Sequence, residues 1–231
     1  MIRGYYFVMN TVLQTPEDIR QHIWKELGRA THDRHHAWRT PVLATATVDA
    51  GVNARTVVLR RVDALGQVLE IYTDNRSSKV SELTAQPLAC LVFWSPRLRW
   101  QLRVHAKWSV QATGVDVASR WQAVRQTRAA GDYMSQIPPG AFLPNDGGKT
   151  EVDIKVNADS DAEIDAKVNV NLDYKCDANI DTVVDALTQN ADENYFTVLR
   201  AQVVEIDWLE LGREGHRRAK LVEKKWQWLN P

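Results

Sequence analysis

Arg55-Thr-Val-Val-Leu-Arg60 is a strand-like run that begins and ends with arginine, and Tyr72-Thr73-Asp-Asn-Arg76-Ser77-Ser78-Lys79 follows it. The second run leaves a strand and enters a turn crowded with hydroxyl and cationic side chains. A helix that starts after such a turn presents free backbone N–H groups to an anion, and hydroxyls and cations add charge-assisted hydrogen bonds. Together the two runs predict a phosphate held at the rim of a small β-barrel.

The same residues also fit ordinary structural roles, which the sequence leaves open. Arg55 and Arg60 are five positions apart, so in a regular strand they point to opposite faces. Two solvent-exposed strand cations would account for them equally well. A serine N-cap beside an unrelated arginine and lysine would account for the second run.

Short strands surround this stretch and indicate its setting. The apolar pattern predicts strands over 42–48, 55–62, 68–73, 88–94, 99–112 and 196–209. Helices are expected over 77–85 and 115–130, the latter with Trp121 and Val124 facing inward, and a further helix from Thr15 that ends at Gly28. Residues 30–40 are polar and are expected to form a loop. Short strands at this spacing with one interrupting helix are typical of a closed or half-closed antiparallel barrel.

Residues 146–194 differ from the rest of the 231-residue chain. They hold 13 acidic residues against 4 lysines, whereas the remainder holds 16 acidic and 25 basic residues. Alternating apolar positions in this segment predict a hairpin with one solvated face, followed by a short helix. Asp and Asn are frequent, but their spacing does not follow a calcium-binding loop. We therefore expect a single domain over residues 1–231 with an acidic insertion at about 146–194.

Composition excludes several classes of function. The formal net charge is zero, which argues against a strongly basic nucleic-acid binder. No apolar run reaches the length of a membrane span, and the start of the chain does not look like a signal peptide. The two cysteines make no disulfide framework, and a solvated loop explains His32, His35 and His36 better than a metal site. The expected protein is cytoplasmic, with no membrane, nucleic-acid or metal partner.

The segment from about Pro41 to Ala106 resembles the pyridoxamine 5′-phosphate oxidase-like FMN-binding split barrels. The resemblance rests on the two opening runs, on Gln86-Pro87 with the apolar strand after it, and on Trp100-Gln101-Leu-Arg103. It implies a mainly β fold with flanking helices, a split β-barrel that binds FMN. It also implies a homodimer with FMN at the subunit interface.

The resemblance also implies roles for individual residues. Arg55 and Lys79 would hold the FMN phosphate, the strand backbone and the Tyr72-Thr73 pair would meet the flavin and its ribityl chain, and Gln101 would reach the flavin from the partner subunit. The full set of implied cofactor contacts is Arg55, Thr56, Val57, Val58, Leu59, Arg60, Tyr72, Thr73, Arg76, Ser77, Ser78, Lys79, Gln101, Trp208 and Arg218.

The end of the chain extends the resemblance. In the family a Trp, and an Arg ten residues later, contact FMN, and Trp208 and Arg218 have that separation. Taken alone, Trp208 is better explained as a core aromatic. His216 is the candidate catalytic residue, as a proton donor or as a group that orients the substrate, although an exposed structural histidine explains it equally well.

The chain departs from the oxidases where they grip their substrate. Glu214-Gly215-His216 stands in place of their Arg-Leu-His triplet, and Thr127 and Gly131 stand where a Tyr and an Arg hold the substrate phosphate. Ser135 alone persists there as a candidate substrate contact. An Arg replaced by a Glu turns attraction for an anionic substrate into repulsion.

These features predict an FMN-binding oxidoreductase that acts by flavin hydride transfer on an unidentified small molecule, distinct from a true pyridoxamine 5′-phosphate oxidase. Two other functions remain open. The chain could bind FMN or a B6 vitamer without turnover, as a carrier or sensor. It could also be a cofactor-free module that interacts through the acidic insertion.

Overall fold

The structure is a computed structural model that describes residues 15–47, 51–141, 194–213, 215–222 and 225–231. The chain divides into two units, one made of residues 1–140 and 194–231 and the other of residues 141–193. Apart from Ala141, the second unit lies outside the described residues, and so does the predicted hairpin and helix of the acidic insertion. Everything below concerns the first unit.

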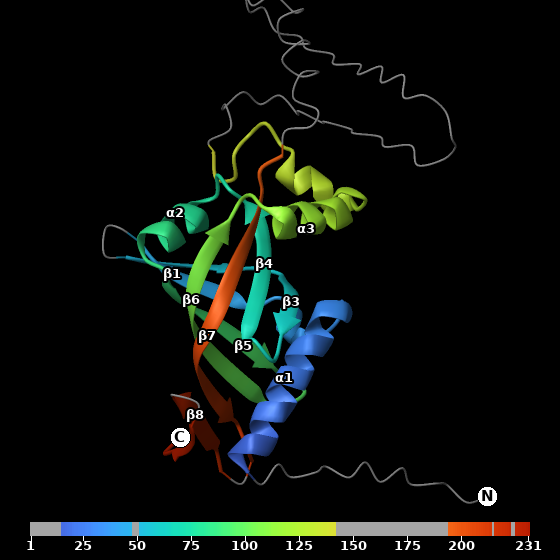
Figure 1. The fold of residues 1–231 in the computed structure, drawn as a ribbon. Helices are drawn as coiled ribbons and strands as arrows, with labels where there is room; N and C mark the ends of the chain where they lie inside the picture. Colours follow the sequence, from blue (N-terminus) through green and yellow to red (C-terminus); the bar gives the residue numbers. More distant parts are fainter. Residues whose placement is uncertain (1–14, 48–50, 142–193, 214, 223–224) are drawn as a thin grey trace, which may run out of the picture. The chain divides into compact units, whose positions relative to one another are not determined.

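The first unit is built around antiparallel strands that curl into a barrel (Figure 1). The path through the sheet is β2-β1-β5-β6-β7-β4-β3, with β8 paired to β7 and β9 to β8. The strands are β1 (Val42–Ala46), β2 (Val52–Thr56), β3 (Leu59–Asp63), β4 (Val68–Asp74), β5 (Leu88–Ser95), β6 (Trp100–Gln111), β7 (Phe196–Glu210), β8 (Arg217–Val222) and β9 (Lys225–Leu229). This arrangement confirms the predicted mainly β fold with flanking helices.

The long strand β7 explains why the barrel is split. On one side it pairs with β6 along almost its whole length. On the other side its first half, from Phe196 to Gln202, pairs with β4, and its second half, from Ile206 to Glu210, pairs with β8. The register with β6 shifts between His105 and Ala106, where β7 passes from one partner to the other. β7 is therefore shared by two parts of the sheet, one that continues through β4 to β3 and one that continues through β8 to β9.

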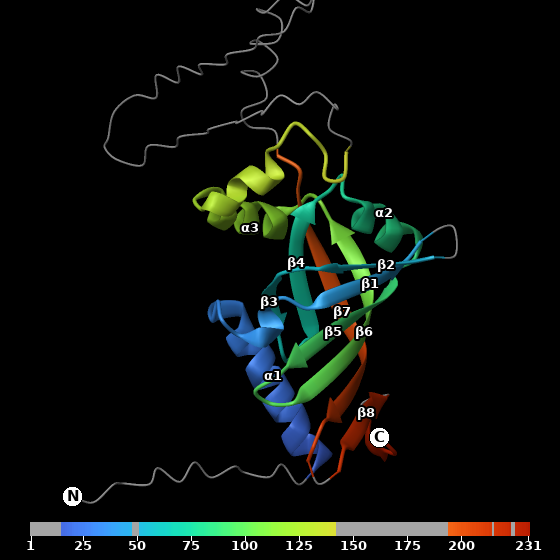
Figure 2. The same cartoon turned by 180° about the vertical axis from the view of Figure 1, so that it is seen from behind.

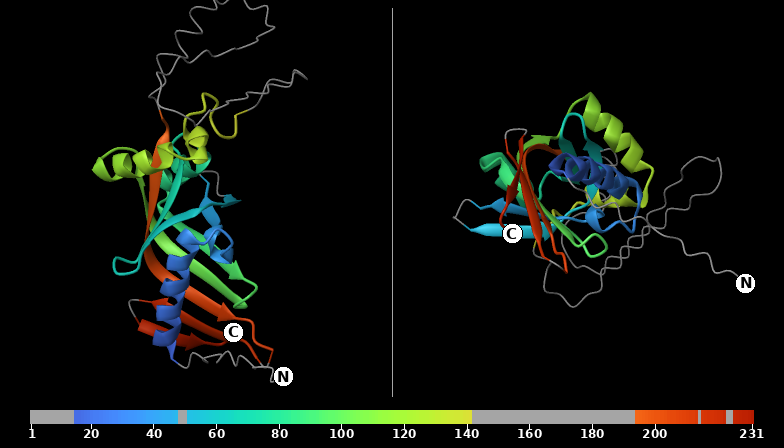
Figure 3. Two further views of the ribbon diagram at one scale, coloured as in Figure 1. Left: turned by 90° about the vertical axis from the view of Figure 1, so that its right-hand side faces the viewer. Right: turned by 90° about the horizontal axis from the view of Figure 1, so that it is seen from below.

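Among the described residues, five helical segments flank the strands. They are α1 (Pro16–His32), the 3₁₀ turn η1 (Ala37–Arg39), α2 (Ser78–Ala85), α3 (Val115–Arg125) and the 3₁₀ turn η2 (Arg128–Tyr133). α1 lies along β3 and against β9 (Figure 3). α2 follows β4 and packs beside β1 and β6, as the view from behind shows (Figure 2). In the part of the chain that the structure describes, no helix combines the length and apolar character that crossing a bilayer requires.

α1 starts where the sequence predicts and continues further. The Thr15 hydroxyl accepts the backbone N–H of Asp18, and the Asp18 carboxylate accepts the backbone N–H of Thr15, which makes a capping box. Ile19, Ile23 and Leu27 are fully buried. Gly28 lies inside the helix rather than at its end, because the buried stripe continues to Ala30. The apolar face of α1 thus overrides the local cost of a glycine.

Three other expectations need correction. The run 55–62 is two strands with a break at Val57 and Val58, where β2 leaves its pairing with β1 and β3 begins its pairing with β4. The expected helix over 115–130 ends at Arg125 and is followed by η2, although Trp121 and Val124 pack inward as predicted. Strands β8 and β9, at the end of the chain, were not predicted.

In the segment 30–40, His32 and His35 are exposed as predicted, but His36 is buried and belongs to a polar cluster around Glu26. Glu26 of α1 is 2% exposed and accepts hydrogen bonds from Arg29 (2.7 Å) and Arg97 (2.5 Å). His36 is also buried, and its Nε2 lies 3.1 Å from the Glu26 carboxylate. Because the Nδ1 of His36 accepts the backbone N–H of Trp38, the hydrogen is on Nε2 and points to Glu26. The cluster fastens α1 to η1 and to the loop after β5.

This cluster predicts acid sensitivity. Burial alone would raise the pKa of Glu26, but hydrogen bonds from His36 and Arg29 outweigh it and hold the pKa below its ordinary value. A carboxyl with a lowered pKa in the folded state stabilises the fold above about pH 4, and that contribution is lost as the pH falls further. We expect Glu26→Gln to lower the free energy of unfolding by about 1–3 kcal/mol at pH 7. The free energy of unfolding of this variant should also fall less between pH 7 and pH 3.5 than that of the wild type. Urea unfolding at pH 7 and at pH 3.5 measures both effects. If the variant loses as much stability between these two pH values as the wild type does, Glu26 is not the source of the acid sensitivity.

Candidate functional site

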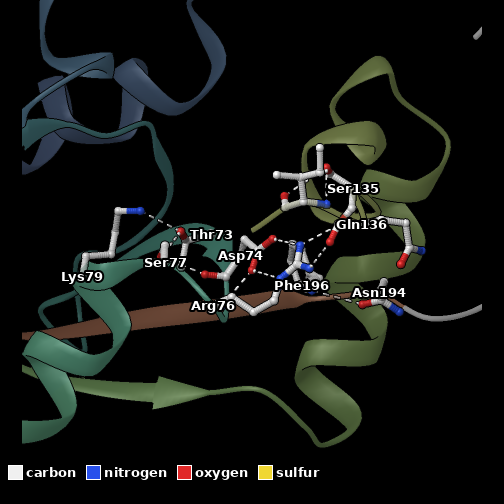
Figure 4. Close-up of polar contacts among 10 residues, drawn as sticks. Thr73, Asp74, Arg76, Ser77, Lys79, Ser135, Gln136, Asn194 and Phe196 are labelled. Carbon is white, nitrogen blue, oxygen red and sulfur yellow. Dashed lines mark hydrogen bonds and ion pairs between the residues drawn. The ribbon is translucent and has the colours of Figure 1, made fainter. Parts of the chain in front are cut away.

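The predicted phosphate-binding residues gather where β4 ends and α2 begins (Figure 4). The Lys79 ammonium donates to the Thr73 hydroxyl at 3.0 Å, and that hydroxyl lies 3.1 Å from the hydroxyl of Ser77. Thr73 and Ser77 are buried, while Lys79 is half-buried. A cation and two hydroxyls thus form one connected group within seven positions of the chain.

The start of α2 leaves its first backbone N–H groups without a side-chain cap. Ser77 is the N-cap residue, but its side chain makes no capping hydrogen bond. Its hydroxyl donates instead to the carbonyl of Asp74 at 2.8 Å. The interpretation in which Ser77 merely caps the helix is therefore wrong. An anion at this position would meet uncapped N–H groups, two hydroxyls and Lys79.

Arg55, on β2, lies close enough to this group to affect it electrostatically. The pKa of Lys79 is lowered, first by burial and then by the positive charge of Arg55, while Asp74 and Glu82 act in the opposite direction. Arg55 donates to the Thr45 hydroxyl of β1 and, at 2.8 Å, to the carboxylate of Glu82 on α2. Two neighbouring cations suit a phosphate, and the carboxylate of Glu82 beside Arg55 was not predicted from the sequence.

Arg60 supplies a further donor on the next strand. Its guanidinium lies 6.0 Å from the centre of the Tyr72 ring, and its Nε is buried with no hydrogen-bond partner. Burial raises the pKa of Tyr133, and the nearby charge of Arg60 partly opposes this. A buried donor without a partner is costly, and this nitrogen is one of several such buried atoms among the described residues. The strand break at Val57 and Val58 removes the strict alternation that set Arg55 and Arg60 on opposite faces.

Between the two arginines, the side chains mostly face the protein interior. Leu59 is fully buried and Val57 is 7% exposed, while Val58 is half-buried and Thr56 exposed. Val57 and Leu59 belong to the barrel core. For these two residues, any contact with a cofactor would come from the backbone, as the resemblance implies.

Arg76, a predicted phosphate contact, makes several contacts within the chain. It pairs with Asp74 at 2.7 Å and stacks 3.3 Å from the centre of the Tyr195 ring. It also donates to the backbone carbonyls of Ser135 at 2.6 Å and Gln136 at 3.3 Å (Figure 4). These contacts fasten the loop after η2 to the turn before α2, so Arg76 positions that turn. Ser78 is exposed at the first position of α2.

The predicted substrate contact Ser135 therefore lies on a loop tied to this turn. Its hydroxyl bonds to the backbone of Ile137 at 3.1 Å and 3.2 Å. The hydroxyl closes its own turn, and the loop is exposed. The structure thus brings Ser135 near Arg76, with its side chain occupied locally.

Gln101 and Arg218 share one face of the sheet. Gln101 of β6 pairs with Leu209 of β7, which pairs with Arg218 of β8, so the three side chains lie in one row. Arg218 binds both carboxylate oxygens of Asp207, at 3.0 Å and 2.7 Å, and Arg103 binds the same carboxylate. Burial would raise the pKa of Asp207, but these two arginines lower it.

Trp208 lies on the other face and is fully buried. Its ring packs edge-on against Trp100 at 5.2 Å, and its register partners are Leu102 and Ala219. Adjacent strand positions alternate between faces, so Trp208 and Arg218 do not present their side chains to the same place. Within this chain Trp208 is a core aromatic, the explanation favoured when it is considered alone. His216 is exposed just before β8.

β8 lies at the opposite end of the barrel from α2 (Figure 1). Arg218 therefore cannot complete the group around Lys79 within one chain. The site residues form two separate sets, one at the start of α2 and one on the outer face of β6 and β8.

Comparison with known proteins agrees with the architecture. Residues 2–112 match the model of the pyridoxamine 5′-phosphate oxidase FMN-binding domain. Over these residues the chain is similar to the pyridoxamine 5′-phosphate oxidase-like FMN-binding family, and the resemblance predicted from the sequence is confirmed. FMN, the cofactor predicted from the sequence, is confirmed as the one that the matched family domain binds.

Curated relatives cover only part of the chain. The pyridoxine/pyridoxamine 5′-phosphate oxidase of Chromohalobacter salexigens is 35% identical over 105 residues, which are 44% of this chain and 47% of the relative. The enzyme of the same description from Azorhizobium caulinodans is 47% identical over 62 residues, 27% of this chain and 28% of the relative. The chain thus spans about half or less of the length of the curated relatives it matches.

Solved structures share the fold over most of the length. A pyridoxamine 5′-phosphate oxidase-related FMN-binding protein from Nostoc punctiforme aligns with a TM-score of 0.60 at 21% identity, covering 94% of this chain and 99% of the other. PhzG from Burkholderia lata, in complex with tetrahydrophenazine-1-carboxylic acid, aligns with a TM-score of 0.58 at 16% identity, covering 91% of each chain. At these identities the likeness concerns the fold.

Proposed function

We propose that this chain is an FMN-dependent oxidoreductase that works as a homodimer on a small molecule in the cytoplasm. The observation that carries the proposal is the group at the start of α2, where Lys79, Thr73 and Ser77 join beside Arg55. These residues fit a phosphate monoester attached to a polar chain, as FMN is.

The proposed roles of the residues follow from their placement. Lys79 and Arg55 hold the phosphate, the uncapped start of α2 adds backbone donors, and Arg76 fixes the turn through Asp74 and the loop of Ser135. When bound, FMN supplies hydride transfer, so the protein needs no catalytic triad of its own. His216 is proposed to hold or deliver a proton at the substrate.

The second subunit enters the proposal because one chain holds two separate sets of residues. Gln101 and Arg218 lie on an outer face, at the far end of the barrel from α2. On that face Trp94 lies opposite Gln101 and is 42% exposed, and Leu88 is 59% exposed. A partner that covers this face would bury both apolar side chains and bring its own Gln101 and Arg218 to the flavin.

If the dimer proposal is right, one substitution should weaken both dimerisation and FMN binding. Trp94→Glu places a charge on the face that we expect to be buried, so the chain should become monomeric and should bind FMN more weakly because the partner's contacts are removed. Size-exclusion chromatography with light scattering, and an FMN titration, measure the two effects. Leu65→Glu, at a position 99% exposed in the turn between β3 and β4, is the control. A Trp94→Glu dimer with unchanged affinity would contradict the proposed interface.

The decisive experiment for the function is an absorption spectrum of the purified full chain, with mass analysis of whatever denaturation releases. Flavin bands and the mass of FMN support a flavoprotein, and anaerobic bleaching by NADH or NADPH with reoxidation in air supports an oxidoreductase. Bound FMN that neither nucleotide reduces favours the carrier or sensor. A colourless, folded protein that ignores added FMN favours the interaction module.

A further inference from the structure

A buried carboxylate next to the predicted phosphate cations has no part in the function proposed above. Glu82 of α2 is 7% exposed. Three donors converge on it: the Thr45 hydroxyl at 2.6 Å, the Asn53 amide at 2.6 Å and the Arg55 guanidinium at 2.8 Å. Thr45 also accepts a hydrogen bond from Arg55. Arg55 therefore has two of its nitrogens bonded to groups inside the protein.

Glu82 neutralises the charge of Arg55 without a ligand, whereas the Lys79 ammonium is bound to the Thr73 hydroxyl. Arg55 and Lys79 are mutually repulsive, since the charge of Arg55 helps to lower the pKa of Lys79. Of the two carboxylates that oppose this effect, Asp74 is bound to Arg76, whereas Glu82 is bound to Arg55. Glu82 is ionised, because hydrogen bonds from Thr45 and Asn53 and the charge of Arg55 together outweigh its burial and lower its pKa. It is the counter-ion that allows Arg55 to lie beside Lys79.

We propose that Glu82 is an internal substitute for the cofactor phosphate, which pairs with Arg55 in the absence of ligand and sets how strongly the site selects a phosphorylated flavin. The inference rests on the proposed FMN site at Arg55 and Lys79. A phosphate that approaches Arg55 has to share it with a carboxylate and meets the negative charge of that carboxylate. Glu82 therefore weakens phosphate binding while it stabilises the empty protein.

A second role for Glu82 predicts the opposite result. If Glu82 served to aim the Arg55 guanidinium at the phosphate, removing its charge would loosen Arg55 and lower the affinity for FMN. The sign of the change in affinity therefore separates the two roles.

The experiment compares two ligands that differ only in the phosphate. The full chain, freed of any bound flavin, is titrated with FMN and with riboflavin, and the ratio of their dissociation constants measures the contribution of the phosphate. For Glu82→Gln we expect this ratio to shift toward FMN by about tenfold, on the scale of removing one partly screened charge near a phosphate. The riboflavin affinity should stay unchanged, and the melting temperature without ligand should fall.

Control variants keep every outcome informative. Asn53→Ala removes a donor to Glu82 but leaves the carboxylate and its pairing with Arg55. The ratio of the two dissociation constants in this variant should therefore match that of the wild type. Glu82→Ala removes the charge by a second route if the glutamine variant does not fold. A ratio in Glu82→Gln that is unchanged or shifted toward riboflavin overturns the inference. A wild-type chain that binds both flavins equally well would instead overturn the phosphate site itself.

Discussion

Replacing Arg55 and Lys79 together with alanine should release FMN from a chain that remains folded. Each residue is expected to supply a charge-assisted hydrogen bond worth about 1.5–3 kcal/mol, so the pair should weaken FMN binding by roughly 150-fold to 25,000-fold. Both side chains are partly exposed and lie outside the apolar core, so the chain should still fold, but with lower stability because the buried Glu82 loses its partner Arg55. Quenching of flavin fluorescence gives the affinity, and circular dichroism gives the fold.

A matched control removes the same charge elsewhere. Lys25 and Arg34 are exposed on α1 and just beyond it. Their double alanine variant should bind FMN as the wild type does. Stoichiometric flavin in the Arg55→Ala, Lys79→Ala protein would show that the phosphate lies somewhere else.

Trp208→Ala should be strongly destabilising. Together with Trp208→Phe, it should distinguish a role of Trp208 in the core from a role in FMN binding. A fully buried tryptophan that is truncated to alanine typically costs about 3–5 kcal/mol, because the cavity it leaves is only partly refilled. Trp208 is fully buried and packs against Trp100, so it fits that case. Trp208→Phe should keep most of the stability and should bind FMN within a few-fold of the wild type. Chemical denaturation and an FMN titration are the measurements.

Trp228 provides the comparison for Trp208. It packs 6.4 Å from Trp208 but is 47% exposed, so Trp228→Ala should cost much less stability. If Trp208→Phe has normal stability but binds no FMN, Trp208 contacts the cofactor, as the family resemblance implies.

The parts of the site that could be predicted from the sequence are those made by neighbouring residues. Thr73, Ser77 and Lys79 lie within seven positions, and the strand-to-helix transition that joins them is visible in the local pattern. Their convergence needs no knowledge of the rest of the chain. Most strands of the barrel were predictable for a similar reason, because each of them carries its own local run of apolar residues.

Contacts between distant residues could not be predicted in this way. Arg55 and Glu82 are 27 positions apart, and Arg76 and Ser135 are 59 apart, so only the folded topology brings them together. One local signal for Glu82 existed, since it lies three positions after Lys79 on a helix and therefore shares its face. His36 was misjudged because a polar sequence around it hid its burial against Glu26.

The placement of Trp208 and Arg218 on opposite faces of the sheet has a geometric cause. A separation of ten residues fits the family pattern, but it does not fix which faces of the strands the two residues occupy. The register of the final hairpin pairs Leu209 with Arg218 and Trp208 with Ala219. That register depends on the conformation of the connection between β7 and β8, which the spacing of residues does not reveal.

Sharing β7 between two sheet halves has a consequence for how the protein opens. If the half with β3 and β4 or the half with β8 and β9 detaches by itself, β7 still keeps its hydrogen bonds to β6. Deuterium should therefore enter the β7 amides that bond to β6 last, and only through global unfolding. The other amides of β7 should exchange at two different rates, one for Phe196 to Gln202 and one for Ile206 to Glu210.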